Sequence, residues 1–393
     1  MMTFHLILLN ITCVSFFLLA FIAFVNPLKV NITANKWFGV FLFSVGSAIL
    51  DSIIYKVNAQ NAYRQLIAFD ELSRFAMAPA LYLSVLHYTS PDKTLKKTEY
   101  LHFLPFAIFF IFGSSFVVYP HHPIVNPDFF PEILKIIVQF FIRLSIPVQL
   151  IVYWTLSYYK LTQHRKNILL ITSNAIPINL NWLRLLLFGI LFLIVISISD
   201  VVIGDQLVQT YTSVIYLTGI LFIAYFLLAQ KEVYPYDVQE LESINAVINA
   251  EKNSVQTKLR FTELKLAELQ SQLTSLMENN RLYLDSEIGL PELAKEMNIS
   301  SHDLSYLLND GFGVNFSQFI NRYRINEAKQ LMLSDKYRHL NILGIAYNAG
   351  FNSKTTFNTT FKKETGLSPS QFIKQAKENT LTRLQQLDLI GSE

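Results

Sequence analysis

The sequence predicts an all-α protein that consists of a seven-helix membrane bundle, a coiled-coil connector and a C-terminal domain with two helix-turn-helix motifs. Three observations favour this fold. Of the 393 residues, 52% are hydrophobic and only 16% are charged, whereas soluble proteins carry about 25% charged residues. The apolar excess lies before residue 231 in runs of helical length, and a polar segment with two pairs of short helices follows it. The two parts are therefore expected to lie in different solvents.

Seven apolar runs within residues 1–231 are each long enough to cross a bilayer, because about 20 helical residues span its hydrocarbon core. One such run would equally fit a buried helix of a soluble protein. Seven in succession, joined by short polar loops, favour a membrane bundle, and prolines inside the runs are tolerated in a packed bundle. The runs are residues 4–25, 37–55, 65–88, 100–118, 132–159, 180–203 and 209–230.

The basic residues of the loops indicate the orientation of this bundle. The first, third and fifth loops hold eight Lys and Arg residues, whereas the second, fourth and sixth hold two. Loops rich in Lys and Arg face the cytoplasm. The sequence therefore predicts a multi-pass protein of the bacterial cytoplasmic membrane, with the N-terminus outside and the chain after Lys231 in the cytoplasm. No basic residue precedes the first run, so we expect it to remain a helix instead of being removed as a signal peptide.

Charged side chains inside the apolar runs form a candidate sensor site. An unpaired charge in a membrane is costly, so such residues point to a ligand or ion site. A structural ion-pair network is an equal alternative, because Asp70 and Arg74 are four residues apart on one helix. The acids outnumber the arginines by four to two, so we expect the site to respond to protons, a metal ion or a cationic ligand from outside. The candidates are Asp51, Asp70, Glu71, Arg74, Arg143 and Asp200.

The polar segment at residues 232–280 carries a heptad pattern. Apolar residues recur at the two seam positions from Leu241 to Leu276, most regularly from Val255 onward. A narrow seam of this kind predicts a parallel coiled coil that joins two chains into a homodimer. A single amphipathic connector helix is the alternative.

Residues 281–378 show the same helical pattern twice. A short helix at 290–297 precedes a second at 301–308, which Ser300 caps; the pair predicts a helix-turn-helix. A long linking helix is expected at 316–333. Helices at 341–348 and 353–363 then repeat the pair, with Gly350 in the turn, where it supplies backbone freedom. Residues 379–393 form a C-terminal tail.

The second pair closely resembles the signature of AraC/XylS-type transcription regulators. The residues that carry the resemblance are Ala346-x3-Gly350-Phe351-x5-Phe357-x3-Phe361-Lys362-x3-Gly366-x-Ser368-Pro369. The upstream residues Ile299-Ser300, Leu304-Ser305, Arg324, Ala328 and Leu331 resemble that family's first helix-turn-helix and linking helix, and Leu308 stands where the family usually has Phe. The resemblance covers about the last hundred residues. It implies two recognition helices in major-groove segments about 34 Å apart, in a membrane-anchored subgroup of the family.

The charges of the two motifs differ in sign. Residues 281–310 hold two basic and six acidic residues, whereas residues 311–378 hold ten basic and four acidic residues. Attraction to phosphate is therefore expected mainly from the second motif and the linking helix. A solvated basic face is the alternative, but together with the family signature the charge favours DNA.

Polar side chains on the outer faces of the two recognition helices are the candidates for base contacts, because Lys can approach guanine and Asn can pair with adenine. Phosphate contacts position a protein without reading sequence. The base candidates are Ser301, His302, Ser305, Tyr306 and Asn309 in the first helix, and Ser353, Lys354, Thr355, Asn358 and Thr359 in the second. The phosphate candidates are Arg324, Lys362 and Lys363.

No arrangement for catalysis, a cofactor or a metal is visible. Cys13 is the single cysteine, and the adjacent His121 and His122 are expected to be ordinary loop residues. The sequence thus predicts a membrane-bound one-component transcription regulator with promoter DNA, membrane lipid, a second copy and, if it activates, RNA polymerase as partners. The alternative is a membrane transporter or receptor whose helical tail binds a protein partner.

Overall fold

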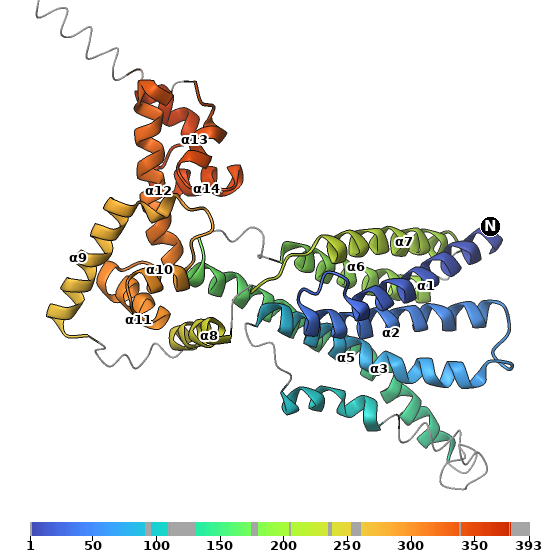
Figure 1. The fold of residues 1–393 in the computed structure, drawn as a ribbon. Coiled ribbons are helices and arrows are strands. Elements are labelled where there is room, and N and C mark those ends of the chain that lie inside the picture. Colours follow the sequence, from blue (N-terminus) through green and yellow to red (C-terminus); the bar gives the residue numbers. More distant parts are fainter. Residues whose placement is uncertain are drawn as a thin grey trace, which may run out of the picture. The chain divides into compact units, whose positions relative to one another are not determined.

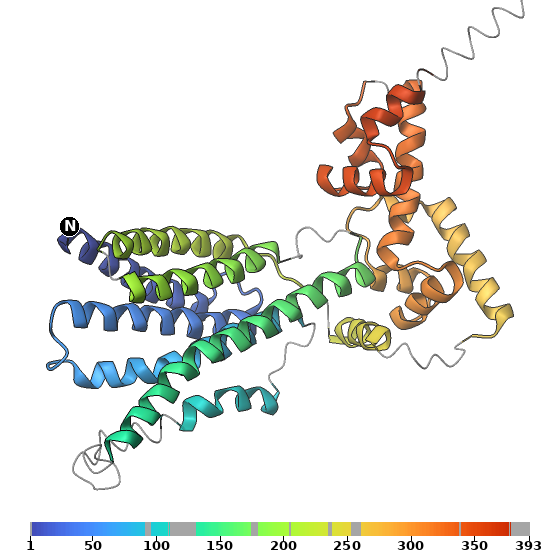
Figure 2. The same cartoon turned by 180° about the vertical axis from the view of Figure 1, so that it is seen from behind.

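The computed structural model describes residues 2–90, 96–108, 110, 131–173, 180–203, 206–234, 238–252, 261–337, 339–376 and 378. The chain divides into two compact units, Met1–His164 with Leu180–Pro235, and Arg165–Asn179 with Tyr236–Glu393. Throughout these described ranges every regular element is a helix (Figure 1, Figure 2). The predicted all-α class is confirmed.

The first unit contains long helices at six of the seven predicted apolar runs. Within the residues described here, three stretches are long and apolar enough to cross a membrane: Phe4–Val25, Ile32–Lys56 and Tyr211–Ala229. In the fourth run only a 3-10 helix, η1 (Lys97–Phe103), and residues 104–108 and 110 are described. Seven crossings therefore remain a prediction. The long helices are α1 (Met2–Val25), α2 (Ile32–Lys56), α3 (Arg64–Thr89), α5 (Glu132–Ile171), α6 (Asn181–Ile203) and α7 (Gln206–Ala229).

Helix α1 has one face in the bundle and one apolar face outside it. It packs against α2 and α7, and Gly46 of α2 lets it approach closely, since a Cβ there would lie 3.1 Å from Phe16. Large apolar side chains spaced three and four residues apart cover the outer face: Phe4, Ile7, Ile11, Val14, Leu18 and Phe21. A continuous apolar stripe of this length is unusual on a surface that faces water.

The second unit contains the two predicted helix pairs. α10 (Leu290–Glu296) precedes α11 (Ser301–Tyr306), which η5 (Leu307–Gly311) continues, and α13 (Ile342–Asn348) precedes α14 (Lys354–Thr365). The linking helix α12 (Phe316–Leu333) begins with a reciprocal capping box between Asn315 and Gln318. Each of α11, α13 and α14 begins at a Ser or Asn whose side chain accepts a backbone N–H bond.

The predicted coiled-coil seam is not one continuous helix. α8 (Val238–Lys252) and α9 (Glu263–Asn280) are separate, and α9 starts at Thr262, which has extended backbone and accepts a bond from the N–H of Lys265. Seam residues Leu269 and Leu273 are 2% and 0% exposed, and α9 packs against η4 (Leu282–Leu284) and η5.

Leu269 and Leu273 are therefore buried by contacts within the same chain, and assigning them to a dimer seam was wrong. The packed C-terminal domain begins before the predicted boundary at residue 281. The homodimer itself remains a prediction.

Candidate nucleic-acid interface

Helix α14 presents a polar and basic face opposite a buried one. Phe357 and Phe361 are both 0% exposed and form the domain core with α12 and α13. The opposite face carries the second set of predicted DNA contacts. Ser353 is half-buried and caps the helix. Asn358 is half-buried, and the exposed members are Lys354, Thr355, Thr359, Lys362 and Lys363. Asn358, Thr359, Lys362 and Lys363 line a shallow, open depression.

The turn between α13 and α14 is held against the start of the domain. Gly350 lies in the left-handed region at φ +89°, and a Cβ at this position would overlap the carbonyl oxygen of Tyr283. From the sequence, Gly350 is expected in this turn because glycine supplies backbone freedom. The structure adds a second reason, the close approach of another backbone segment.

Arg324 is not available to phosphate, which corrects its assignment as a contact. It is 1% exposed. Its Nε donates to the carbonyl of Tyr283 at 2.7 Å, and its Nη2 donates to the carbonyl of Asp285 at 2.8 Å. The guanidinium also lies 5.8 Å from the Phe351 ring centroid. Burial lowers the pKa of Arg324 to about 10, against an opposing effect of the carboxylates of Asp285 and Glu287. Its role is to join α12 to the loop before α10.

Helix α11 is less accessible than α14. Ser301 is only 5% exposed, so its assignment as an exposed candidate was wrong. His302, Ser305 and Tyr306 are half-buried, and Asn309, in η5, is exposed. The Tyr306 ring packs edge-on against Phe261, with centroids 5.6 Å apart, and α8 packs against α11.

Three of the predicted sensor residues form an ion-pair triad between α2 and α3. Asp51 and Asp70 are 7% and 3% exposed. Nη2 of Arg74 lies 2.5 Å from Oδ2 of Asp51 and 2.8 Å from Oδ2 of Asp70. The second oxygen of Asp51, Oδ1, is buried and lacks a hydrogen-bond partner in the part of the chain described. Two carboxylates thus share one guanidinium.

The side chains of Glu71, Arg143 and Asp200 lie outside the described residues, as do His121 and His122. Among the side chains that are described, no group of three or more His, Cys, Asp and Glu residues is placed to hold a metal ion. Of the six predicted sensor residues, the structure therefore describes the side chains of the three in the triad.

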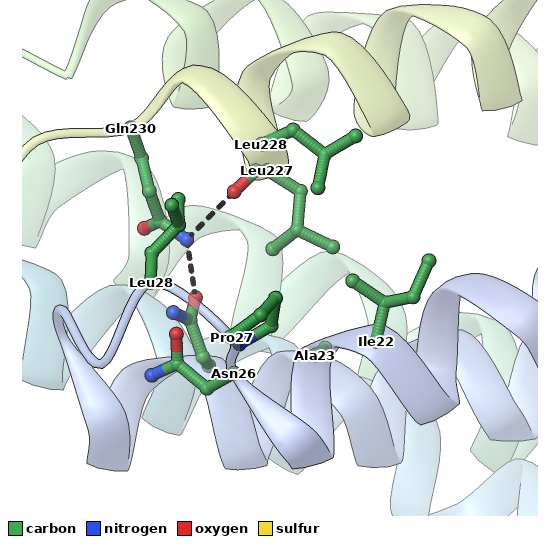
Figure 3. Close-up of a pocket in the computed structure, with 9 residues that line it drawn as sticks. Ile22, Ala23, Asn26, Pro27, Leu28, Leu227, Leu228 and Gln230 are labelled. Atoms are coloured by element: carbon green, nitrogen blue, oxygen red, sulfur yellow. Dashed lines mark hydrogen bonds between the residues drawn. The ribbon is translucent and has the colours of Figure 1, made fainter.

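A polar cluster where α7 ends was missed in the sequence. Nε2 of Gln230 donates to Oδ1 of Asn35 at 3.1 Å, and the Tyr88 hydroxyl donates to the same oxygen. Nδ2 of Asn31 donates to Oε1 of Gln230 and to the carbonyl of Lys231. Beside them, Asn26, Gln230 and apolar neighbours enclose a cavity of about 10 Å³ (Figure 3), room for roughly one water molecule.

The chain just after α7 is also fixed to the first unit. Tyr234 is 3% exposed. Its hydroxyl donates to the carbonyl of Thr89 at 3.3 Å and lies 3.1 Å from Nδ1 of His164 in α5. Isolated Asn, Gln and Tyr residues scattered over about 200 positions give no sequence signal for such a cluster.

Comparison with known proteins identifies the C-terminal part. The family described as helix-turn-helix domain matches residues 293–375, which extend from within α10 to beyond α14. The chain is 24% identical over 199 residues to the HTH-type transcriptional activator RhaS of Mannheimia succiniciproducens, covering 44% of this chain and 71% of that protein. It is 27% identical over 139 residues to the melibiose operon regulatory protein of Escherichia coli, covering 35% and 42%. The C-terminal domain is an AraC-type helix-turn-helix domain. The resemblance predicted from the sequence is confirmed for this part of the chain.

Two further similarities are confined to the same region. The transcriptional regulatory protein HptR of Staphylococcus aureus is 32% identical over 92 residues, covering 23% of this chain and 35% of that protein. The matched parts thus span about a third of HptR and about two fifths of the melibiose regulator. A solved structure of a protein of unknown function from Listeria innocua covers 27% of this chain and 94% of its own at 29% identity, but a TM-score of 0.24 supports no structural argument. The relatives named are transcription regulators, which are not enzymes. This agrees with the prediction that the chain is not an enzyme.

Proposed function

We propose that the chain is a membrane-bound regulator that binds promoter DNA sequence-specifically through the two motifs of its AraC-type domain, under the control of a signal sensed at or across the membrane. The observation that carries the DNA-binding part is the accessible face of α14. Two phenylalanines hold the helix in the core, and the lysines and threonines opposite them are exposed. A helix anchored in this way can enter a major groove without unfolding the domain.

The side chains of α14 divide into two roles. Lys354, Thr355, Asn358 and Thr359 occupy the first two turns and are assigned to base edges. Lys362 and Lys363 lie in the last turn, and we assign them to phosphates on the groove wall.

Substitutions on α14 test this division. Lys354→Ala and Asn358→Ala are each expected to cost about 1–3 kcal/mol on the preferred sequence and to relax the preference at one position. Lys363→Ala is expected to weaken binding to all sequences alike and to reduce the salt slope by about one. Genome-wide mapping of bound DNA supplies the promoter fragments. Binding is then measured by fluorescence anisotropy with the full chain in lipid nanodiscs, at several salt concentrations.

Lys265→Ala is the matched control, because Lys265 is half-exposed on α9 and pairs with Glu268. It is expected to leave DNA affinity unchanged. Identical behaviour of the Lys354 and Lys363 variants would show that the reading face has been assigned wrongly.

The membrane part of the proposal rests on the first unit. Its three long apolar stretches and the outward apolar stripe of α1 fit a lipid environment. With the N-terminus outside, as the loop charges predict, the Asp51–Asp70–Arg74 triad lies in the outer half of the membrane. The polar cluster around Asn35 and Gln230 then lies at the cytoplasmic end, where the chain leaves for the DNA-binding domain.

The triad is the proposed sensing element. Its two carboxylates and one guanidinium leave one negative charge, which a proton or a cation from outside would neutralise. The triad links α2 to α3, so neutralisation would change how tightly these helices are held together. Because the cluster at the other end fixes the chain after α7 to the same bundle, a shift of the helices would reach the connector.

Substitutions in the triad test the sensing role. Asp51→Asn is expected to shift the stimulus dose for half response by a factor of about ten, since one of the two acids is lost. Arg74→Gln leaves two buried carboxylates without their cation and is expected to fix the output at one level. A reporter on a mapped promoter, titrated with pH and with cations, measures both. Ser52→Ala, at an exposed position beside Asp51, is the control. Normal responses in both triad variants, at normal protein levels, would make the triad purely structural.

A further inference from the structure

Helix α8 buries its apolar face within the second unit. Leu241, Ile244, Val247 and Ile248 follow helical spacing and are 9%, 0%, 2% and 4% exposed. The helix packs against α11 and α10, and both views of the fold show it beside this pair (Figure 1, Figure 2). α8 therefore packs against the first motif of the AraC-type domain, and it begins within a few residues of the end of the first unit.

The side of α11 that would read DNA is only partly exposed. Leu304 and Leu307 are 0% exposed and face the domain core. Ser301 precedes Leu304 by three residues and shares its buried face. His302, Ser305 and Tyr306 occupy the other side and are half-buried, and Asn309, in η5, is exposed. On this side the Tyr306 ring contacts Phe261, and α8 packs against the same helix.

The corresponding surface of the second motif is more open. Lys354, Thr355 and Thr359 of α14 are exposed, whereas Ser353 and Asn358 are half-buried. The two motifs of one domain thus differ in access as well as in charge, and the covered motif is the acidic one.

The major groove is too narrow to admit α11 together with a second helix on its reading face. The groove is about 12 Å wide, and one helix with its side chains is about 10–12 Å in diameter. A groove that admits α11 has no room for α8 lying across its reading face. While α8 is docked, only α14 can enter the DNA.

We propose that α8 is an autoinhibitory cover of the first recognition helix, and that the first motif reads DNA only after α8 and Phe261 leave α11. This inference rests on the proposed function, because it assigns DNA reading to α11. It makes α8 the regulated element: the docked state binds DNA through one motif, and the released state binds through two. The membrane unit would act on α8 through the short stretch of chain that joins them.

Thiol labelling of the full chain in nanodiscs tests the cover without any DNA. Cys13 is the single cysteine and is buried, so a Cys13→Ala background carries one introduced cysteine at a time, Ser305→Cys or Thr359→Cys. We expect a maleimide to label position 305 about tenfold more slowly than position 359, because labelling at 305 needs α8 to open. Equal rates would overturn the proposal.

The second part of the labelling experiment uses variants that weaken the packing of α8. Ile244→Asp places a charge in the buried face of α8, and Phe261→Ala is a milder change that removes the contact with Tyr306. Both are expected to raise labelling at 305 severalfold and to leave position 359 unchanged, which also shows that the domain remains folded. If 305 stays slow in both variants while 359 is unchanged, something other than α8 covers it and the proposal is wrong.

Footprinting on mapped promoter DNA separates the cover from the proposed function. The unaltered chain is expected to protect one major-groove segment, and the loosened variants a second segment about 10 base pairs away. Faster labelling at 305 with no longer footprint would overturn the inhibitory role and leave binding by α14 intact. If no variant gave a footprint on any mapped promoter, the proposed function would fall, and the inhibitory role with it.

Discussion

Arg324→Ala is expected to remove about 3 kcal/mol from the unfolding free energy of the C-terminal domain. The substitution leaves the carbonyls of Tyr283 and Asp285 without their buried donor, and each such orphaned group costs about 1–3 kcal/mol. It also empties the space beside Phe351. Relief of the cost of burying the guanidinium offsets part of the loss, as the lowered pKa of Arg324 indicates. Since small domains have a total stability of about 5–15 kcal/mol, this is a large share.

Arg322→Ala is the matched control, because Arg322 lies on the same helix and is exposed. It is expected to change stability by no more than about 0.5 kcal/mol. Trp37, Trp154 and Trp182 all lie in the first unit, so tryptophan fluorescence does not report on the domain. Pulse proteolysis of the full chain in nanodiscs over a urea series does. Equal midpoints for the two variants would mean that the Arg324 bonds contribute no net stability.

Arg324→Lys refines the same experiment. Lysine keeps the charge, but its single ammonium cannot match the fork that reaches two carbonyls. We expect a midpoint between those of the alanine variant and the unaltered chain. This prediction separates the hydrogen-bond geometry from the charge.

The features of the fold that the sequence predicted correctly are those set by local chemistry. Ser300 caps α11 because its hydroxyl accepts the backbone N–H of the residue three positions on. Phe357 and Phe361 are one turn apart, so they had to share a face, and that face is buried. The exposed face of α14 follows from the same spacing. These conclusions need no knowledge of which segment packs against the helix.

The errors concern contacts between segments far apart in the sequence. A leucine stripe that includes Leu269 and Leu273 predicts a buried face, but nothing in its period says whether the partner is a second chain or the same domain. The partner is the same domain, through η4 and η5. Arg324 was assigned by its charge, although it lies at four-residue spacing from Ile320 and Ala328, both 0% exposed. That spacing placed it on the buried face of α12.

The polar cluster at the end of α7 marks a different limit. Asn35 and Gln230 are 195 positions apart in the sequence, and neither belongs to a recognisable motif. Only the packing of α2 beside the end of α7 brings them together. The proposed sensing route through this cluster therefore depends on the fold. The charged residues of the triad were visible from residue types alone, but the pairing of Asp51 with Arg74 was not.

Gly350→Ala is expected to destabilise the C-terminal domain by about 3 kcal/mol, from two causes that act together. At φ +89° an L-residue pays about 1–2 kcal/mol for the left-handed backbone. The added Cβ would also overlap the Tyr283 carbonyl oxygen and lie 2.9 Å from Cα of Leu284. Both neighbours are backbone atoms held by Arg324, so they cannot move aside without breaking its bonds, and overpacking of this kind costs about 1–3 kcal/mol.

Gly366→Ala isolates the first cause. Gly366 also has a left-handed backbone, at φ +76°, but a Cβ there meets no atom within 4 Å. Its expected cost is therefore the cost of the left-handed backbone alone, about 1–2 kcal/mol. Pulse proteolysis in urea, as for Arg324, gives both midpoints, and the difference between them measures the close approach of the α13–α14 turn to the Tyr283 backbone. If the two alanine variants unfold at the same urea concentration, the turn is not packed against that segment. Arg324 would then have to hold the loop before α10 without help from the second motif.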